Sequence, residues 1–153
     1  MLTGKVALVT GSAQGIGYAI GSTLARHGAR LVLADMDADG CRAAQEQLRS
    51  AGAQVVAVAG NVAVVKDVEA MVGAAVTAFG RLDILVNNAG GSAQTPLRIE
   101  DVTEEHFDRV MAWNVRGTFF CAKAALPHLK ARGGSIINMA SISGRGGTEL
   151  VSP

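Results

Sequence analysis

One stretch near the amino terminus decides the fold: Val6-Ala7-Leu8-Val9-Thr10-Gly11-Ser12-Ala13-Gln14-Gly15-Ile16-Gly17. Its first four residues form an unbroken apolar run, which is typical of strands buried on both faces of a parallel sheet. Closely spaced glycines follow, and the residues after them show helical spacing as far as Gly28, a typical helix stop. The stretch therefore predicts a buried strand, a glycine-rich turn and a helix over residues 16–27.

The same alternation of strand and helix continues along the chain. Further short apolar runs occur at residues 31–34, 55–58, 84–86 and 136–137, the last within a strand predicted near residues 135–140. Segments with helical spacing lie between them, at residues 41–51, 65–79 and 103–132. Parallel strands joined by right-handed helical crossovers form an open sheet with helices on both faces. We therefore expect an α/β fold, with a doubly wound parallel sheet of about five strands in three αβα layers.

The composition argues against several classes of protein. Fourteen Lys and Arg residues against thirteen Asp and Glu residues leave a formal net charge of +1, which argues against electrostatic binding to nucleic acid or an anionic membrane. No apolar run reaches the length of a transmembrane helix, and no signal peptide is expected. Cys41 and Cys121 fit no metal-binding or redox spacing. We expect free thiols, a cytoplasmic protein and no metal site.

The glycine pattern between the first strand and helix predicts a dinucleotide site of the Rossmann type. Gly11 permits a sharp turn, Gly15 lets a pyrophosphate approach the backbone, and Gly17 lets the helix pack closely on the strand. The start of the helix offers free N–H groups to the phosphates, so Gln14 and Ile16 of the same turn are also candidates for cofactor binding. The alternative is a glycine-rich turn without a ligand, which the strand–turn–helix context disfavours.

Asp35 ends the second predicted strand, where a carboxylate can bind the ribose hydroxyls of an adenosine and repel a 2′-phosphate. Neither the turn residues Ala13 and Gln14 nor the positions after Asp35, which are Met36 and Asp37, carry a positive charge. We therefore predict NAD(H) as the cofactor in preference to NADP(H). The alternative is that Asp35 or Asp37 only caps the next helix, and we expect this of Asp37.

Four motifs follow one another along the chain. They are Thr10-Gly11-xxx-Gly15-x-Gly17, then Asn87-Asn88-Ala89-Gly90, then Asn114, and finally Ile137-Asn138-Met139-Ala140-Ser141. Together they resemble the classical short-chain dehydrogenase/reductase family, from Lys5 to Pro153. The resemblance implies an oxidoreductase that transfers a hydride between NAD(P) and a secondary alcohol or ketone. It also implies a homo-oligomer that associates near residues 103–132.

The resemblance further implies roles for individual residues on the cofactor side. Asn88, Ala89 and Gly90 would steady the central strand and line the adenine–ribose side of the cofactor. Asn61 and Val62 match the pair that meets the adenine, although the family usually has Asp where this chain has Asn61. An amide oxygen can still accept a hydrogen bond from the adenine amine.

Two catalytic candidates also come from the resemblance. Asn114 would hold a water in a proton relay, and Ser141 would hydrogen-bond the substrate oxygen. Ser141 lies just past the carboxyl end of a predicted strand, where open α/β sheets bind ligands, and its hydroxyl can both donate and accept. Because Ser141 lies in no Gly-x-Ser-x-Gly turn, a hydrolase nucleophile is disfavoured.

The acid/base group of the family is a tyrosine followed four residues later by a lysine. By the family pattern the tyrosine would come directly after Pro153, and Tyr18, the only tyrosine, lies far too early in the chain. We therefore expect residues 1–153 to be a single dinucleotide-binding domain, incomplete at its carboxyl-terminal side. Alone it should be inactive, because hydride transfer to a ketone needs a proton donor at the oxygen. The alternative is a non-catalytic NAD-binding or interaction module.

Overall fold

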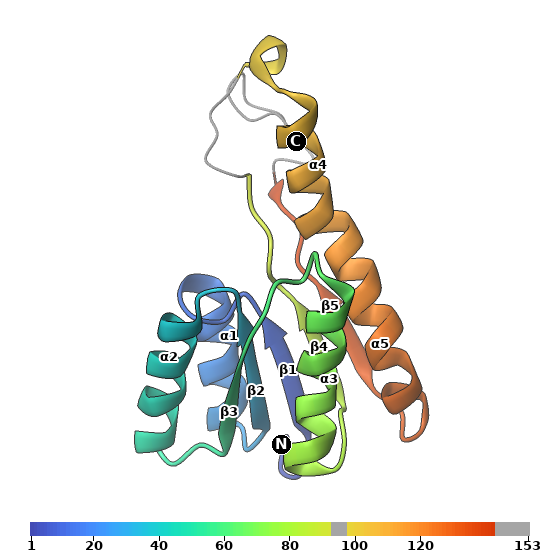
Figure 1. Ribbon diagram of the computed structural model, residues 1–153. Helices are drawn as coiled ribbons and strands as arrows, with labels where there is room; N and C mark the ends of the chain where they lie inside the picture. Colours follow the sequence, from blue (N-terminus) through green and yellow to red (C-terminus); the bar gives the residue numbers. More distant parts are fainter. Residues whose placement is uncertain (93–97, 143–153) are drawn as a thin grey trace.

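The computed structural model of the chain describes residues 1–92 and 98–142. In these residues five parallel strands form one sheet, in the order β3-β2-β1-β4-β5 (Figure 1). The strands are β1 (Val6–Thr10), β2 (Arg30–Asp35), β3 (Val55–Ala59), β4 (Ile84–Asn87) and β5 (Ser135–Asn138). The predicted open α/β sheet of the Rossmann type is confirmed, and the sheet is not closed.

Helices cover both faces of the sheet. On one face lie α1 (Gly15–Arg26) and α2 (Ala38–Ser50), and on the other lie α3 (Val65–Phe79) and α5 (Thr118–Lys130). Asp37 caps α2 as predicted, because its side chain accepts the backbone N–H of Gly40 at 3.0 Å. None of the helices in the described part of the chain is both long enough and apolar enough to span a bilayer.

The single helix predicted over residues 103–132 is divided in the structure. It consists of α4 (Glu104–Met111), a π-helical turn η2 (Ala112–Gly117) and α5, and a short 3₁₀ turn η1 (Ile99–Asp101) precedes it. The Asn114 Nδ2 donates at 2.8 Å to the backbone oxygen of Val110, the carbonyl that an α-helix would pair with the Asn114 backbone N–H. Together α4, η2 and α5 form one continuous helical arm: its α5 part packs on the sheet, and its α4 end rises beyond the carboxyl ends of the strands (Figure 1).

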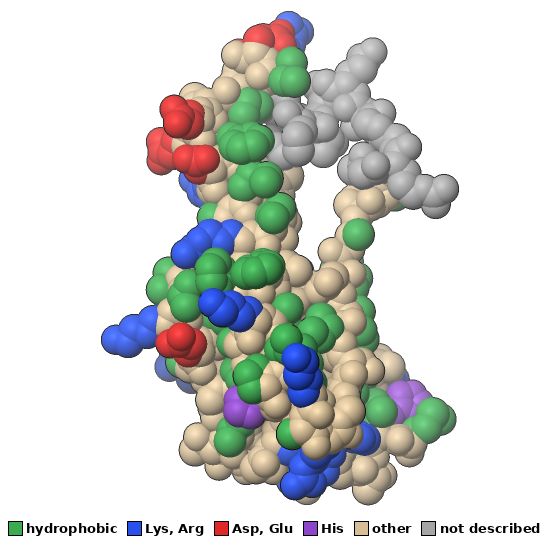
Figure 2. Space-filling view, turned by 90° about the vertical axis from the view of Figure 1, so that its right-hand side faces the viewer, with side chains coloured by type: hydrophobic (Ala, Val, Ile, Leu, Met, Phe, Trp, Pro, Cys, Tyr) green, Lys and Arg blue, Asp and Glu red, His purple; other side chains and the backbone are tan. Residues whose placement is uncertain are grey.

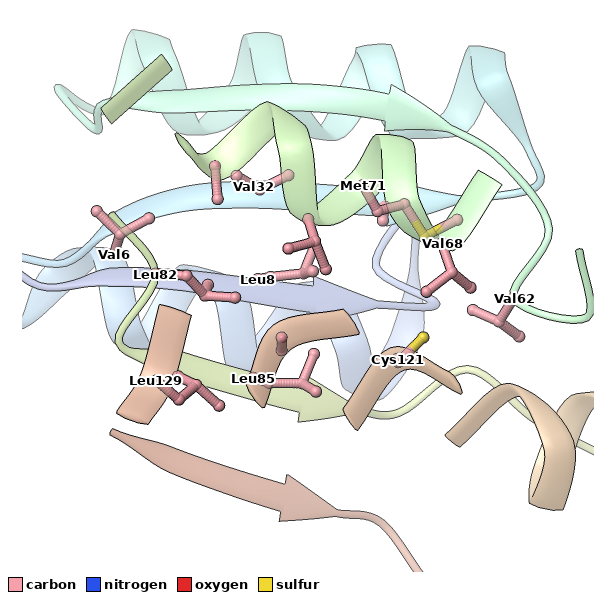
Figure 3. Close-up of a cluster of buried hydrophobic side chains, with 14 residues drawn as sticks. Val6, Leu8, Val32, Val62, Val68, Met71, Leu82, Leu85, Cys121 and Leu129 are labelled. Carbon is pink, nitrogen blue, oxygen red and sulfur yellow. The ribbon is translucent and has the colours of Figure 1, made fainter. Parts of the chain in front are cut away.

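Two apolar clusters hold the sheet between its helices. Successive residues of β1 face opposite sides: Val6 and Leu8 belong to the cluster under α3 and α5, and Ala7 belongs to the cluster under α1 and α2. Figure 3 shows the first cluster, in which Met71 of α3 and Leu129 of α5 meet the strand residues. All of β1 is buried, which explains why its sequence is apolar without alternation.

The last strand, β5, is the most exposed part of the sheet. All four of its residues are exposed, including Ile136 and Ile137. It pairs only with β4 among the described strands. The Asn87 Nδ2 donates to the Asn138 Oδ1 at 2.9 Å and so links these two strands through their side chains as well.

The amino-terminal ends of β1 and β4 are joined through Asp83. The carboxylate of Asp83 is 2% exposed and accepts the backbone N–H of Val6 at 2.9 Å and the Arg81 Nε at 2.7 Å. Lys5 adds an ion pair at 3.4 Å. Burial raises the pKa of this carboxyl, but the bonds from Arg81, Val6 and Lys5 outweigh it, so that the pKa of Asp83 is lowered.

We expect Asp83→Asn to lower the free energy of unfolding by about 2 kcal/mol at neutral pH, since a hydrogen bond to a charged group contributes about 1.5–3 kcal/mol. The folded carboxyl has the lower pKa, so its stabilisation is complete above the unfolded value, about 4. It is lost as the pH falls through the folded value. Urea unfolding at neutral and acidic pH should therefore show a difference that shrinks with acid. An equal difference at both pH values would contradict this role of the charge.

Candidate functional site

The predicted cofactor residues gather where β1, β2 and β4 end. From β1 the chain continues to β2 on one side, and from β4 it continues to β5 on the other. Open α/β sheets bind ligands at such a switch point, outside the carboxyl ends of the strands. A cavity of about 250 Å³ opens here. Of the predicted residues, it is lined by Gly11, Gln14, Asp35, Asn61, Val62, Ala89 and Gly90.

The glycines of the first turn let neighbouring backbone segments lie so close together that a Cβ atom on Gly11 or Gly17 would clash with them. A Cβ atom on Gly17 would lie 2.0 Å from the backbone oxygen of Gly11, and one on Gly11 would lie 2.8 Å from the Ala89 Cα. Gly15 has a left-handed backbone, with φ +58°, and no atom lies within 4 Å of the place of its Cβ. The turn is therefore tightly packed beneath and leaves the backbone at Gly15 open to a ligand.

Asn88 and Thr10 bond the glycine turn to the loop after β4. The Asn88 Nδ2 donates to the backbone oxygens of Thr10 at 3.0 Å and Gly11 at 2.9 Å. In return, the Thr10 Oγ1 accepts the backbone N–H of Asn88 at 3.1 Å and that of Ala89 at 3.0 Å. These four bonds hold the glycine turn and the loop after β4 in a fixed position relative to each other.

Asp35 lies at the carboxyl end of β2, and both of its oxygens are oriented by the backbone. Its Oδ2 accepts the N–H of Ala13 at 2.9 Å, and its Oδ1 accepts the N–H of Asp37 at 3.0 Å. A carboxylate has about four acceptor positions, so further hydrogen bonds from hydroxyls remain available. None of the described residues that line the cavity carries a positive charge.

Asn61 and Val62 form the β3 side of the cavity. The Asn61 Oδ1 accepts the backbone N–H of Ala63 at 2.9 Å, so the amide is turned into its own loop, and the adenine contact implied for it stays a prediction. The side chain of Val62 packs against Gly117 of η2, where a Cβ would lie 2.9 Å from the Val62 Cγ2. The arm therefore contacts this side of the cavity directly.

The two catalytic candidates are placed in different ways. Asn114 lies in η2, where its Oδ1 accepts the backbone N–H of Gly91 at 3.1 Å and its Nδ2 donates to the Gly91 oxygen at 2.9 Å. Its amide thus binds the loop after β4. Ser141 is exposed and follows β5 at the same edge of the sheet. Their roles in a proton relay and at a substrate oxygen stay predictions.

Four residues that line the cavity were not predicted to do so: Ala34, Met36, Gly60 and Trp113. Met36 follows Asp35 directly, and its place in the sequence was a sufficient signal. Trp113 is the only tryptophan and stands next to Asn114. Its direction could not be predicted, because Trp113 lies inside a π-helical turn, whose residues depart from the regular helical spacing expected over residues 103–132.

Comparison with known proteins gives consistent matches. A family model described as short chain dehydrogenase matches residues 5–153. Sorbitol dehydrogenase of Cereibacter sphaeroides is 41% identical over 152 residues, which are 98% of this chain and 57% of that protein. Elsinochrome reductase 1 of Elsinoe fawcettii is 43% identical over 145 residues (94% and 53%). D-Threitol dehydrogenase of Mycolicibacterium smegmatis is 43% identical over 141 residues (92% and 54%). The chain spans a little over half the length of these relatives.

Proposed function

Since this chain belongs to the short chain dehydrogenase family, we propose that the whole protein transfers a hydride between NAD(H) and a secondary alcohol or ketone. The family consists of oxidoreductases that use nicotinamide cofactors, and the relatives are named dehydrogenases and reductases. The observation that carries the proposal is the glycine turn, packed tightly at Gly17 and open at Gly15, beside a cavity at the switch point of the sheet.

The residues of this turn fit a dinucleotide. The backbone N–H groups at the start of α1, near Gln14, Gly15 and Ile16, would hold the pyrophosphate. Asp35 would accept the hydroxyls of the adenosine ribose, and its charge would disfavour a 2′-phosphate. The nicotinamide supplies or takes the hydride when it is bound. These residues support NAD(H) over NADP(H).

Chemistry at the substrate oxygen needs groups of its own. Ser141, exposed at the carboxyl edge of the sheet, would hydrogen-bond that oxygen. Asn114 would hold a water of the proton relay, and its side-chain amide also binds the loop after β4 at Gly91. General acid catalysis contributes about 10²–10⁴-fold, and these 153 residues contain no tyrosine followed four residues later by a lysine. We therefore expect this chain by itself to bind the nucleotide without turnover.

Calorimetric titration of the chain with NADH and with NADPH tests the cofactor assignment. We expect NADH to bind more tightly. Tighter binding of NADPH would overturn the preference, and a folded chain that binds neither would overturn the dinucleotide site. Dehydrogenase activity is measured on the whole protein purified from its source. The assay supplies NAD and a panel of secondary alcohols that includes sorbitol and threitol. Binding without turnover on such a panel would favour the alternative, a non-catalytic module.

We also propose that the whole protein is a homo-oligomer, associated through the helical arm. Hydrophobic side chains gather along this arm (Figure 2). Among the exposed ones are Phe107, Met111, Val115 and Phe119, which follow one another every four residues. Met111, Val115 and Phe119 line one hollow on the arm, and Phe107 lies one turn before Met111 on α4. They form an apolar stripe of the kind that marks protein–protein contacts.

For the location of the protein we propose the cytoplasm. Cys41 and Cys121 are both buried and free. Burial raises the pKa of the Cys121 thiol to about 11, so this thiol stays protonated and unreactive at neutral pH. Free, buried thiols are typical of a reducing compartment.

A further inference from the structure

Among the described residues that line the cavity, Trp113 is the one aromatic residue, and it lies outside the motifs that identify the family. We propose that Trp113 stacks on the adenine base of the bound cofactor, and that the π-helical turn η2 holds its indole in that place. The inference rests on the proposed function, because it assigns a residue to the adenosine half of the same dinucleotide site.

The position of the cavity selects the adenosine half. In a dinucleotide site of this kind the pyrophosphate lies at the helix N-terminus and the carboxylate after the second strand takes the ribose hydroxyls. The base then lies beyond the ribose, towards β3. Trp113 lines the same cavity as Asp35, Asn61 and Val62, which form that side. The volume of this cavity is about 250 Å³. Whole ligand pockets have about 300–1,000 Å³, so the cavity suits one part of a dinucleotide.

The backbone that carries Trp113 is held by both loops that flank the cavity. On the β3 side, Gly117 packs against Val62, and the Arg116 guanidinium donates to the backbone oxygen of Ala63. On the β4 side, the Asn114 amide bonds both the N–H and the oxygen of Gly91. The indole is therefore presented by a fixed support and not by a mobile loop.

The surroundings of Trp113 agree with a role at a ligand. Its side chain is half-buried, and it belongs to neither of the two apolar core clusters of the described residues. The indole of Trp113 lines the cavity, and an indole carries a flat apolar ring. Every nucleobase can stack on such a face, and losing one stack weakens binding by about 5- to 150-fold.

Calorimetry on the chain and its Trp113→Leu variant tests this contact with three probes: NADH, ADP-ribose and nicotinamide mononucleotide. We expect the variant to bind NADH and ADP-ribose about tenfold more weakly, by the same factor, because both contain the adenosine. The affinity for nicotinamide mononucleotide should not change. Trp113→Phe keeps an aromatic face and should retain most of the affinity. Leu126→Ala, at an exposed position of α5 that has no part in the site, is the control and should leave the affinities for all three probes unchanged.

The intrinsic fluorescence of the chain gives a second readout, because Trp113 is its only tryptophan. ADP-ribose should quench this fluorescence, and nicotinamide mononucleotide should not. If the chain binds NADH and Trp113→Leu binds it equally well at an equal melting temperature, the assignment of Trp113 is wrong and the cofactor proposal stands. A loss confined to nicotinamide mononucleotide would also overturn it. If the unaltered chain binds neither NADH nor ADP-ribose, both proposals fail.

Discussion

Gly17→Ala is expected to abolish measurable NADH binding and to lower the free energy of unfolding by about 3 kcal/mol. The added Cβ would lie 2.0 Å from the backbone oxygen of Gly11 and 2.6 Å from the Asn88 Nδ2. Neither atom can yield alone, because the Asn88 amide is bonded to the backbone of Thr10 and Gly11. Helix α1 must therefore move away from β1. Overpacking costs about 1–3 kcal/mol, and the broken hydrogen bonds add to it.

Gly73→Ala is the matched control for this change. Gly73 lies inside α3, and no atom is found within 4 Å of the place where its Cβ would be. The same methyl group should there raise the free energy of unfolding by about 0.5–1 kcal/mol, because alanine is the better helix former. Urea unfolding and NADH calorimetry measure both variants. A Gly17→Ala protein that kept its stability and its NADH affinity would show that the close packing of the turn is not required.

Asp35→Asn is expected to weaken NADH binding by about tenfold and to shift the preference between NADH and NADPH by about a hundredfold towards NADPH. A charged hydrogen bond to a ribose hydroxyl, of about 1.5–3 kcal/mol, would become a neutral one of about 0.5–1.5 kcal/mol, and a difference of about 1.4 kcal/mol is tenfold in affinity. At the same time its repulsion of a 2′-phosphate would disappear. The two effects act in opposite directions on the two nucleotides, so their ratio of affinities is the most sensitive measurement.

Asp37→Asn is the control for Asp35→Asn. It removes the same charge two positions later, at a residue that caps α2 through the backbone N–H of Gly40. Asparagine caps helices about as well as aspartate, so both stability and nucleotide preference should stay close to those of the unaltered chain. If Asp35→Asn weakens NADH and NADPH by equal factors, Asp35 acts only by orienting the backbone of Ala13, and the cofactor assignment loses its main support.

Much of the fold could be predicted from short-range patterns. The apolar run of residues 6–9 became β1, which is buried on both faces. Residues 65–79 became α3, with Gly80 in the left-handed conformation at its end. The cap at Asp37 followed from its residue type and position. Each of these features depends on residues a few positions apart, and so each is visible in the order of the residues.

Within the site, the same distinction separates what was predicted from what was missed. The glycine spacing and Asp35 were recognised because each lies next to the strand that positions it. The direction of the Asn61 amide was not foreseen: its oxygen accepts the N–H of Ala63. The two hydrogen bonds between the Asn114 amide and the Gly91 backbone were not foreseen either, because these residues meet only when the arm packs on the loop after β4.

The sequence by itself determined the αβα layering, the glycine turn and the carboxylate that reads the ribose in our proposal, because local spacing and residue type specify them. Only the tertiary structure decided where the long helix changes to a π-helical turn and which residues then face the cavity. The reason is that Trp113 takes its place from contacts of η2 with Val62 and with Gly91. Those contacts join segments far apart in the chain, so the spacing of neighbouring residues does not predict them.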